Sequence, residues 1–378
     1  MRILIVSGNP HVPQFSGGVE STTHDLALEL KKRGHQVAVL CRLIKSVEQS
    51  SKFIMYLRKH SPHHFPADRF LGYPVYRQRY VLLSIPAAVR QFTPDVAIVQ
   101  IGDAVRLAHA LSACSVPVLF YLHNVDFGEM GGNPRTLSGV HFIANSEFTS
   151  RRYKEEYDID SIVIPPLFHA ERYISRHKPS NVTFINPHVF KGRDIALKVA
   201  EHCPEIPFSF IESWTMKEKE VEDLSARIAL LPNVTFRRRT DDMKTVYNQA
   251  KILLVPSVCE EAWGRVVTEA QFTGIPVVAS KIGGLPETVG PGGVLLDPRG
   301  PIEPWVDTVK RLWVDEDFYR VTSAAALAHS RRSEINTTCQ IDALLAAAQK
   351  VMSKTSVLAK PMERHGDSQS SLTMGMKN

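Results

Sequence analysis

The sequence lacks the cysteine patterns of disulfide-rich and zinc-binding proteins. Its five cysteines are widely spaced along 378 residues and form no Cys-x-x-Cys pair, so we expect free thiols in a reducing compartment. No apolar run approaches the roughly 18 residues of a membrane-spanning helix. The apolar run Ile3–Val6 is too short for a signal peptide. We therefore expect a cytoplasmic protein.

A large excess of one charge is also absent. The net charge is +6, which is too small over this length to indicate nucleic-acid binding. Glycine and proline are scattered rather than periodic, which excludes a collagen-like chain. The apolar share of 44% and the charged share of 22% are those of a globular protein, and 378 residues exceed what one hydrophobic core usually organises.

Short apolar runs alternate with longer amphipathic stretches in two series. The first series begins at Ile3–Val6 and ends at Phe142–Ala144, and the second begins at Val182–Ile185 and ends at Val294–Leu296. The runs show almost no period-two alternation, which favours parallel strands that are covered on both faces. We predict an α/β protein with two Rossmann-like, doubly wound domains.

The boundary between the domains is expected in the proline-containing segment Pro165–Ser180. We assign residues 1–170 to the N-terminal domain and residues 171–352 to the C-terminal domain, whose last helices have the option of packing back on the N-terminal domain. Residues 353–378 have little apolar content, and we expect a disordered tail there.

Two motifs lie where a strand is expected to lead into a helix. Gly17-Gly18-Val-Glu20 follows the first apolar run, and paired glycines let a backbone approach a phosphate at a helix N-terminus; a simple turn is the alternative. In the second motif, Glu261 and Glu269 are eight residues apart.

We expect Gly264 to separate the two glutamates, with Glu261 in a loop after a strand and Glu269 on the following helix. Both would then face the crevice at the carboxyl ends of the strands, where open α/β sheets bind ligands. Ionised carboxylates accept hydrogen bonds from ribose and sugar hydroxyls. The alternative is a pair of solvated surface glutamates.

The stretch Pro256–Glu287 closely resembles the E-x7-E signature of retaining glycosyltransferase family 4, whose members have the two-domain GT-B fold with a cleft between the domains. The resemblance covers most of the chain. Further segments resemble family motifs in the same order, namely Gly17-Gly18-Val-Glu20, Leu122-His123-Asn124, Ile143-Ala-Asn145-Ser146, Val163-Ile-Pro165-Pro166, Phe190-Lys191-Gly192 and Asn233–Ser257.

The resemblance implies a role for each matching residue. The N-terminal domain would hold the acceptor and the C-terminal domain the nucleotide-sugar. His123, Glu261 and Lys191 would be catalytic: His123 near the reacting carbon of the donor sugar, Glu261 on the hydroxyls of that sugar, and Lys191 on the diphosphate. Glu269 would hold the ribose hydroxyls. Backbone N–H groups would face the diphosphate from Gly17, Gly18, Trp263, Gly264, Arg265 and Val266.

One position departs from the family pattern. Members of the family usually have an Arg five residues before the Lys of Lys-Gly, where this sequence has Asn186. Arg and Lys together usually neutralise the charge of a departing diphosphate. We therefore expect that His188 or Arg193 takes the place of this Arg, or that the reaction is slower.

The sequence predicts a site without metal or cofactor. Asp158-Ile-Asp160 has the DxD form that binds a metal in other glycosyltransferases, but its context at a helix end favours a structural role. Ser146 is interpreted as a helix N-cap. His63-His64 lacks a third ligand nearby and is interpreted as a solvated pair.

The segment Lys45–Tyr80 carries most of the excess positive charge, interleaved with aromatic residues. It is equally consistent with an ordinary solvated face and with a peripheral membrane contact or a lipid-linked acceptor.

Taken with the resemblance, these features predict a retaining hexosyltransferase. It would transfer sugar from a UDP- or GDP-sugar to a hydroxyl acceptor in glycan, polysaccharide or glycolipid synthesis. The alternatives are a sugar-nucleotide epimerase of the same fold and a catalytically weakened sugar-nucleotide-binding protein. A Rossmann-type oxidoreductase is disfavoured because no GxGxxG pattern occurs.

Overall fold

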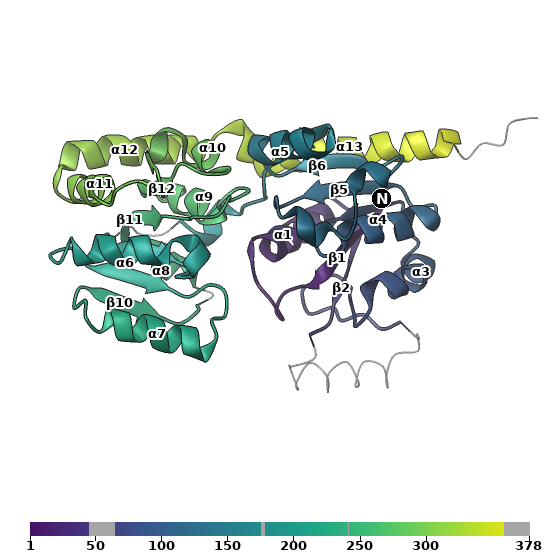
Figure 1. Cartoon of the computed structure of the whole chain (residues 1–378). Helices are drawn as coiled ribbons and strands as arrows, with labels where there is room; N and C mark the ends of the chain where they lie inside the picture. The colour runs from purple at the N-terminus through teal and green to yellow at the C-terminus, as the bar shows by residue number, and fades with distance from the viewer. Residues whose placement is uncertain (45–64, 175–177, 241, 359–378) are drawn as a thin grey trace, which may run out of the picture.

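The chain folds into two α/β domains, each built on one parallel sheet (Figure 1). We describe them from a computed structural model, which covers residues 1–44, 65–174, 178–240 and 242–358. The predicted pair of doubly wound domains is confirmed. None of the helices in these ranges is both long enough and apolar enough to cross a lipid bilayer.

The N-terminal sheet has seven strands in the order β3-β2-β1-β4-β5-β6-β7. Ile3 and Ile5 of β1 pack in one hydrophobic core, whereas Leu4 and Val6 pack in another, because side chains alternate across a sheet. Both faces are therefore buried, which explains the continuous apolar run. The strands are β1 (Arg2–Pro10), β2 (Gln36–Arg42), β3 (Val75–Gln78), β4 (Val96–Val99), β5 (Val118–Leu122), β6 (His141–Ala144) and β7 (Ser161–Val163), and the helices are α1 (Gly18–Lys32), α3 (Val81–Phe92), α4 (Ala104–Ala113) and α5 (Glu147–Tyr157).

The C-terminal sheet has six strands in the order β10-β9-β8-β11-β12-β13. It is also covered on both faces, since Ile252 and Leu254 enter one core and Leu253 and Val255 the other. The strands are β8 (Asn181–Ile185), β9 (Phe208–Ile211), β10 (Val234–Arg237), β11 (Ala250–Val255), β12 (Val277–Ser280) and β13 (Gly293–Leu296), and the helices are α6 (Arg193–Glu201), α7 (Glu218–Ile228), α8 (Met243–Gln249), α9 (Arg265–Gln271), α10 (Leu285–Val289), α11 (Glu303–Val314) and α12 (Glu316–His329).

The last helix, α13 (Thr337–Leu358), returns to the N-terminal domain (Figure 1), where it packs against α1 and β5. Ile341, Leu344 and Val351 pack in the same core as Ile3 of β1. The sequence predicts a tail from residue 353, but the helix continues to Leu358, because extending a helix that is already anchored costs little. Residues 359–378 of that predicted tail lie outside the described residues.

Each sheet reverses its strand order next to its first strand, between β1 and β4 and between β8 and β11. Ligands of open α/β sheets bind outside the carboxyl ends of the strands at such a point. The loops that follow β1, β5, β8 and β11 leave the sheets at these ends. These loops and the helix α9 carry the residues that we predicted from the sequence.

Candidate active site

The paired glycines at the start of α1 lie against the C-terminal domain. A Cβ atom on Gly18 would stand 3.3 Å from Cδ of Arg265, and a Cβ atom on Gly17 would stand 3.8 Å from Nε1 of Trp214. A side chain at Gly18 would therefore crowd Arg265. The glycine pair allows the two domains to approach closely at this point, which is where the sequence predicts the diphosphate.

Glu20 is buried directly behind this loop. A Cβ atom on Gly17 would stand only 2.8 Å from Oε2 of Glu20, so the carboxyl group folds back on the start of its own helix. Burial raises the pKa of Glu20 to about 7, although the backbone N–H groups of Glu20 and Gly17 oppose the shift. Glu20 is therefore a group that titrates near neutral pH beside the glycine loop.

Lys191 and Glu261 form a close ion pair in the C-terminal domain. Nζ of Lys191 lies 2.5 Å from Oε1 of Glu261, and the hydroxyl of Ser257 donates to the same oxygen over 2.7 Å. Nζ of Lys191 also stands 5.0 Å from the ring centroid of Trp214. Lys191 ends a short 3-10 helix after β8, and Glu261 follows β11, so the strand order brings these two predicted residues together.

Gly264 precedes α9 as its N-cap residue, with a φ angle of 76°, a left-handed conformation that glycine adopts without strain. The predicted separation of Glu261 in the loop from Glu269 on the helix is confirmed. Glu269 is buried, and its carboxylate accepts a 2.8 Å hydrogen bond from the hydroxyl of Tyr247. Its other oxygen lies 3.4 Å from Nε of Arg265.

The side chain of Arg265 connects the two domains. Its Nη1 donates over 2.8 Å both to the hydroxyl of Thr22 on α1 and to the carbonyl of Leu167. Its Nη2 lies 3.7 Å from a carboxylate oxygen of Asp25, which is fully buried. The predicted contribution of Arg265 through its backbone is thus accompanied by a side chain committed to the domain interface.

Trp263, Arg265 and Val266 were predicted to face the diphosphate through their backbone N–H groups. The side chain of Trp263 is buried, and its Nε1 donates to the hydroxyl of Thr268 over 3.1 Å, so only its backbone can face a ligand. Arg265 and Val266 occupy the first turn of α9. Backbone N–H groups in a first turn have no partner within the helix, which leaves them available to an anion.

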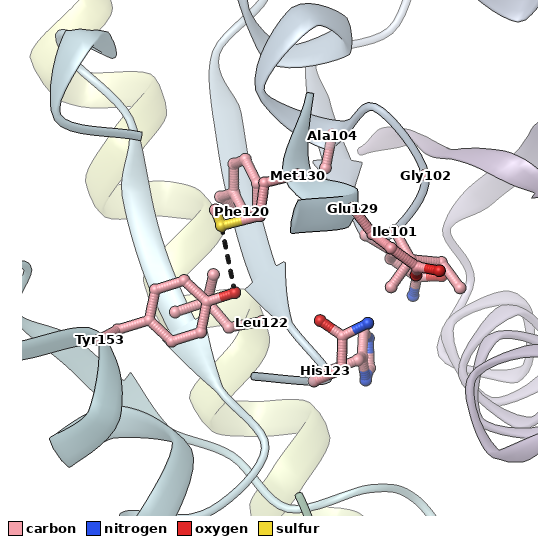
Figure 2. Close-up of a pocket in the computed structure, with 11 residues that line it drawn as sticks. Ile101, Gly102, Ala104, Phe120, Leu122, His123, Glu129, Met130 and Tyr153 are labelled. Carbon is pink, nitrogen blue, oxygen red and sulfur yellow. Dashed lines mark hydrogen bonds between the residues drawn. The ribbon is translucent and has the colours of Figure 1, made fainter. Parts of the chain in front are cut away.

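His123 follows β5 in the N-terminal domain and is buried. Burial, and to a smaller extent the charge of Arg265, lowers the pKa of His123 to about 3, so the imidazole is neutral near pH 7. Its Nε2 and the Nε2 of Gln100 are buried without a hydrogen-bond partner among the described residues. Both residues line a small cavity of about 10 Å³ (Figure 2), which is about the space that one water requires.

Asn186 occupies a left-handed conformation, with φ of 65°. Its side-chain carbonyl accepts a 3.3 Å hydrogen bond from the backbone N–H of Trp214. We expected either His188 or Arg193 to replace the missing Arg, and each lies near an acidic side chain. Nε2 of His188 lies 3.8 Å from Oε1 of Glu220, and Nη2 of Arg193 lies 3.2 Å from Oδ2 of Asp223.

The Asp158–Asp160 pair has its own partner. Nζ of Lys154 lies 2.7 Å from Asp158 and 3.0 Å from Asp160, and Asp158 ends α5 in a left-handed conformation. Over the described part of the chain, no group of three His, Cys, Asp or Glu side chains is arranged to hold a metal ion. His63-His64 lies outside the described residues.

Sequence reasoning missed four residues of this region: Asp25, Trp214, Tyr247 and Ser257. Trp214 carried a usable signal, because it lies in the loop directly after a predicted strand. Asp25 and Tyr247 carried none, since they lie inside helices with no motif around them. Their roles depend on which residues the fold brings next to them.

Each of the two domains matches a known family model. Residues 16–172 match the family model described as Glycosyltransferase Family 4, and residues 204–315 match the model described as Glycosyl transferases group 1. The chain belongs to the family 4-like glycosyltransferases. The expected GT-B fold is confirmed by a glycosyltransferase from Rickettsia africae, which has a TM-score of 0.73 at 17% identity and covers 93% of this chain and 98% of its own.

Two further relatives are informative about this family 4-like glycosyltransferase. A structure of Anabaena HepE in complex with UDP and glucose has a TM-score of 0.71 at 20% identity over 93% of this chain and 99% of its own. A D-inositol 3-phosphate glycosyltransferase from Corynebacterium kroppenstedtii is 37% identical over 117 residues, which are 30% of this chain and 26% of that relative. The match therefore spans about a quarter of the curated relative.

Proposed function

We propose that this family 4-like glycosyltransferase moves a hexose from a nucleotide-sugar to a hydroxyl acceptor with retention of configuration. The observation that carries the proposal is the ion pair of Lys191 and Glu261, 2.5 Å apart, in the domain that faces the Gly17-Gly18 loop. A cation and a carboxylate at this point suit a diphosphate and the hydroxyls of the attached sugar. The UDP and glucose bound in HepE support the same choice of donor.

In the proposed reaction, some residues stabilise developing charge and others orient the substrates. As the bond between the anomeric carbon and the diphosphate oxygen breaks, Lys191 and the first N–H groups of α9 stabilise the charge that develops on the departing diphosphate. The acceptor hydroxyl attacks from the same face and gives its proton to that departing oxygen. Glu261 orients the sugar, and the neutral imidazole of His123 can donate or accept a hydrogen bond without adding charge.

The ribose is assigned to Glu269. Its carboxylate already accepts from Tyr247 and pairs with Arg265, so these two contacts orient it before a ligand arrives. An ionised carboxylate offers about four lone-pair sites. Two hydroxyls of a ribose can therefore bind without displacing Tyr247 or Arg265.

We propose that the reaction uses neither metal nor cofactor, because Lys191 and backbone N–H groups can neutralise the diphosphate in place of a cation. The base of the nucleotide is assigned to uracil or guanine, and the product to a glycan, polysaccharide or glycolipid. The protein is proposed to act in the cytoplasm.

The segment Lys45–Tyr80 is proposed to distinguish a lipid-linked acceptor from a soluble one. Residues 45–64 of this segment lie outside the described residues. In its described part, Tyr80 is exposed and the guanidinium of Arg79 stands 5.2 Å from its ring centroid. A basic and aromatic surface suits anionic lipid headgroups or a lipid-linked acceptor. Sedimentation with anionic liposomes at low salt tests this contact.

A catalytically weakened binding protein remains the second candidate, because Asn186 stands where an Arg is usual. Turnover separates it from the enzyme. The purified chain is incubated with UDP-, GDP- and ADP-sugars, and release of the nucleoside diphosphate is measured with and without hydroxyl acceptors. The enzyme is expected to release diphosphate from one donor class, and Lys191→Ala and Glu261→Ala are expected to abolish release. Retention is read from the anomeric configuration of the product by NMR.

A further inference from the structure

Trp214 lies in the loop after β9, on the C-terminal side of the domain interface. Its side chain is 37% exposed, whereas Trp263 and Trp305 are 3% and 1% exposed and belong to hydrophobic cores. Core packing therefore does not account for Trp214. An exposed indole next to a polar site has an apolar ring for packing and a single N–H for donation.

Three contacts fix the orientation of this indole. The ammonium of Lys191 stands 5.0 Å from the ring centroid, and the imidazole of His188 meets the ring edge-on with centroids 6.1 Å apart. The backbone N–H of Trp214 donates to the side-chain carbonyl of Asn186. The indole edge that carries Nε1 then faces the glycine loop, 3.8 Å from where a Cβ atom of Gly17 would lie.

The free N–H therefore lies between the two groups that the proposed function assigns to the diphosphate. Lys191 is on one side and the Gly17 loop of the other domain is on the other. Within the described residues, the indole N–H makes no hydrogen bond of its own. A donor in this position suits an anionic oxygen that enters between the domains.

We propose that the indole N–H of Trp214 donates a hydrogen bond to the diphosphate of the donor, and that Asn186 positions it. This inference rests on the proposed function. It assigns Trp214 and Asn186 together to the place where an Arg is usual. The Arg would supply a charged donor directly, whereas here a neutral donor reaches the phosphate from the neighbouring loop.

The identity of Asn186 fits this arrangement. Its φ of 65° is a left-handed conformation that Asn tolerates better than most residues, and its carbonyl accepts the N–H of Trp214. An Arg side chain has no acceptor, so it could not hold Trp214 in this way. Asn186, which stands where an Arg is usual, and Trp214 are therefore parts of one arrangement.

The test compares a diphosphate with a monophosphate. UDP and UMP are titrated calorimetrically into the full chain and into the variants Trp214→Phe and Asn186→Ala, with GDP and GMP used if wild type binds these instead. Phe keeps an aromatic ring under Lys191 but lacks the N–H. A hydrogen bond to a charged group contributes about 1.5–3 kcal/mol. Trp214→Phe is therefore expected to lower the affinity for UDP by roughly 10-fold or more and to change the affinity for UMP by much less.

Intrinsic fluorescence gives a second readout. UDP is expected to change the tryptophan emission of wild type and of the control Trp313→Phe, whose indole lies away from the site against Lys251, but not that of Trp214→Phe. Asn186→Ala is expected to lower the affinity for UDP, as Trp214→Phe does, and to lower kcat more than it raises KM for the acceptor.

The outcomes separate this inference from the proposed function. If Lys191→Ala loses UDP while Trp214→Phe binds UDP and UMP as wild type does, Trp214 is not a donor to the diphosphate and the proposed function stands. If wild type binds none of the nucleoside diphosphates, both are wrong.

Discussion

At the scale of single residues, two buried carboxyl groups near the domain interface have opposite surroundings. Glu269 has the guanidinium of Arg265 within 3.4 Å and accepts from Tyr247. Glu20 is equally buried, but its pKa is raised to about 7 because burial outweighs its backbone hydrogen bonds. One carboxylate is therefore held ready to accept hydroxyl groups, and the other changes charge in the physiological range.

The first prediction concerns Glu20 and pH. A carboxyl group whose pKa is higher in the folded state stabilises the fold fully below its unfolded value, and this contribution is lost as the pH rises to about 7. Glu20→Gln keeps an acceptor but cannot ionise. Relative to wild type, its free energy of unfolding should therefore rise between pH 4.5 and pH 8, by on the order of 3 kcal/mol, since one pKa unit corresponds to about 1.4 kcal/mol. Denaturant unfolding at both pH values measures this, and an equal difference at both would refute it.

The second prediction concerns Glu269. Glu269→Ala removes the proposed acceptor of the ribose hydroxyls and should weaken the donor nucleotide by about 1.5–3 kcal/mol, or roughly 10- to 150-fold in Kd. The exposed neighbour Glu260 serves as the matched control, and Glu260→Ala should leave Kd unchanged. Calorimetric titration reads both variants. Unchanged affinity in Glu269→Ala would remove this residue from the site.

At the scale of elements, the start of α5 shows which contacts a sequence reveals. Ser146 was predicted as its N-cap, and the structure confirms this, since its hydroxyl accepts from the N–H of Thr149 over 2.9 Å. The N–H groups of Glu147 and Phe148 are instead bound by Glu287 of α10, in the other domain. No local pattern indicates a cap that comes from 140 residues away.

The same contrast applies to the elements as a whole. Most of the strands were predicted because an apolar run is a pattern of a few neighbouring residues. The short strands β3 and β7 were missed, since neither contains more than two consecutive apolar residues. The contacts of Arg265 with Thr22 and of Trp214 with Gly17 could not be predicted, because they depend on how two separate domains face each other.

The third prediction tests the contact between α10 and α5. Glu287→Ala leaves the first N–H groups of α5 without this carboxylate and should destabilise the protein by about 1 kcal/mol, as loss of an N-cap typically does. Glu287→Gln keeps an acceptor and should cost less. Thermal unfolding measures both, with Ser146→Ala as the variant that removes only the local cap. Melting temperatures of the two Glu287 variants that match wild type would show that the contact does not stabilise the fold.

At the scale of the whole molecule, residues of both domains form the candidate site. Arg265 and Glu287 reach from the C-terminal domain to α1 and α5 of the N-terminal domain, and α13 crosses back to pack on the N-terminal sheet. The glycine loop of one domain meets Trp214 of the other. The residues that are predicted to bind the diphosphate therefore come together only when the two domains face each other as they do here.

The fourth prediction concerns metal ions. Transfer should persist in EDTA, because Lys191, the first N–H groups of α9 and the indole of Trp214 provide donors for the diphosphate without a cation. The measurement is the rate of diphosphate release before and after chelation. Complete loss of the rate, followed by recovery with Mn²⁺ or Mg²⁺, would contradict the prediction and direct attention back to Asp158 and Asp160.

The central claim is that a nucleoside diphosphate binds between the two domains on Lys191. Calorimetric titration of UDP, GDP and ADP into wild type and Lys191→Ala tests it most directly. We predict that wild type binds at least one of the three at a single site, and that Lys191→Ala binds it at least about 10-fold more weakly, as expected for loss of a hydrogen bond to a charged group. Equal affinity in the two proteins, or no binding of any of the three to wild type, would contradict the account.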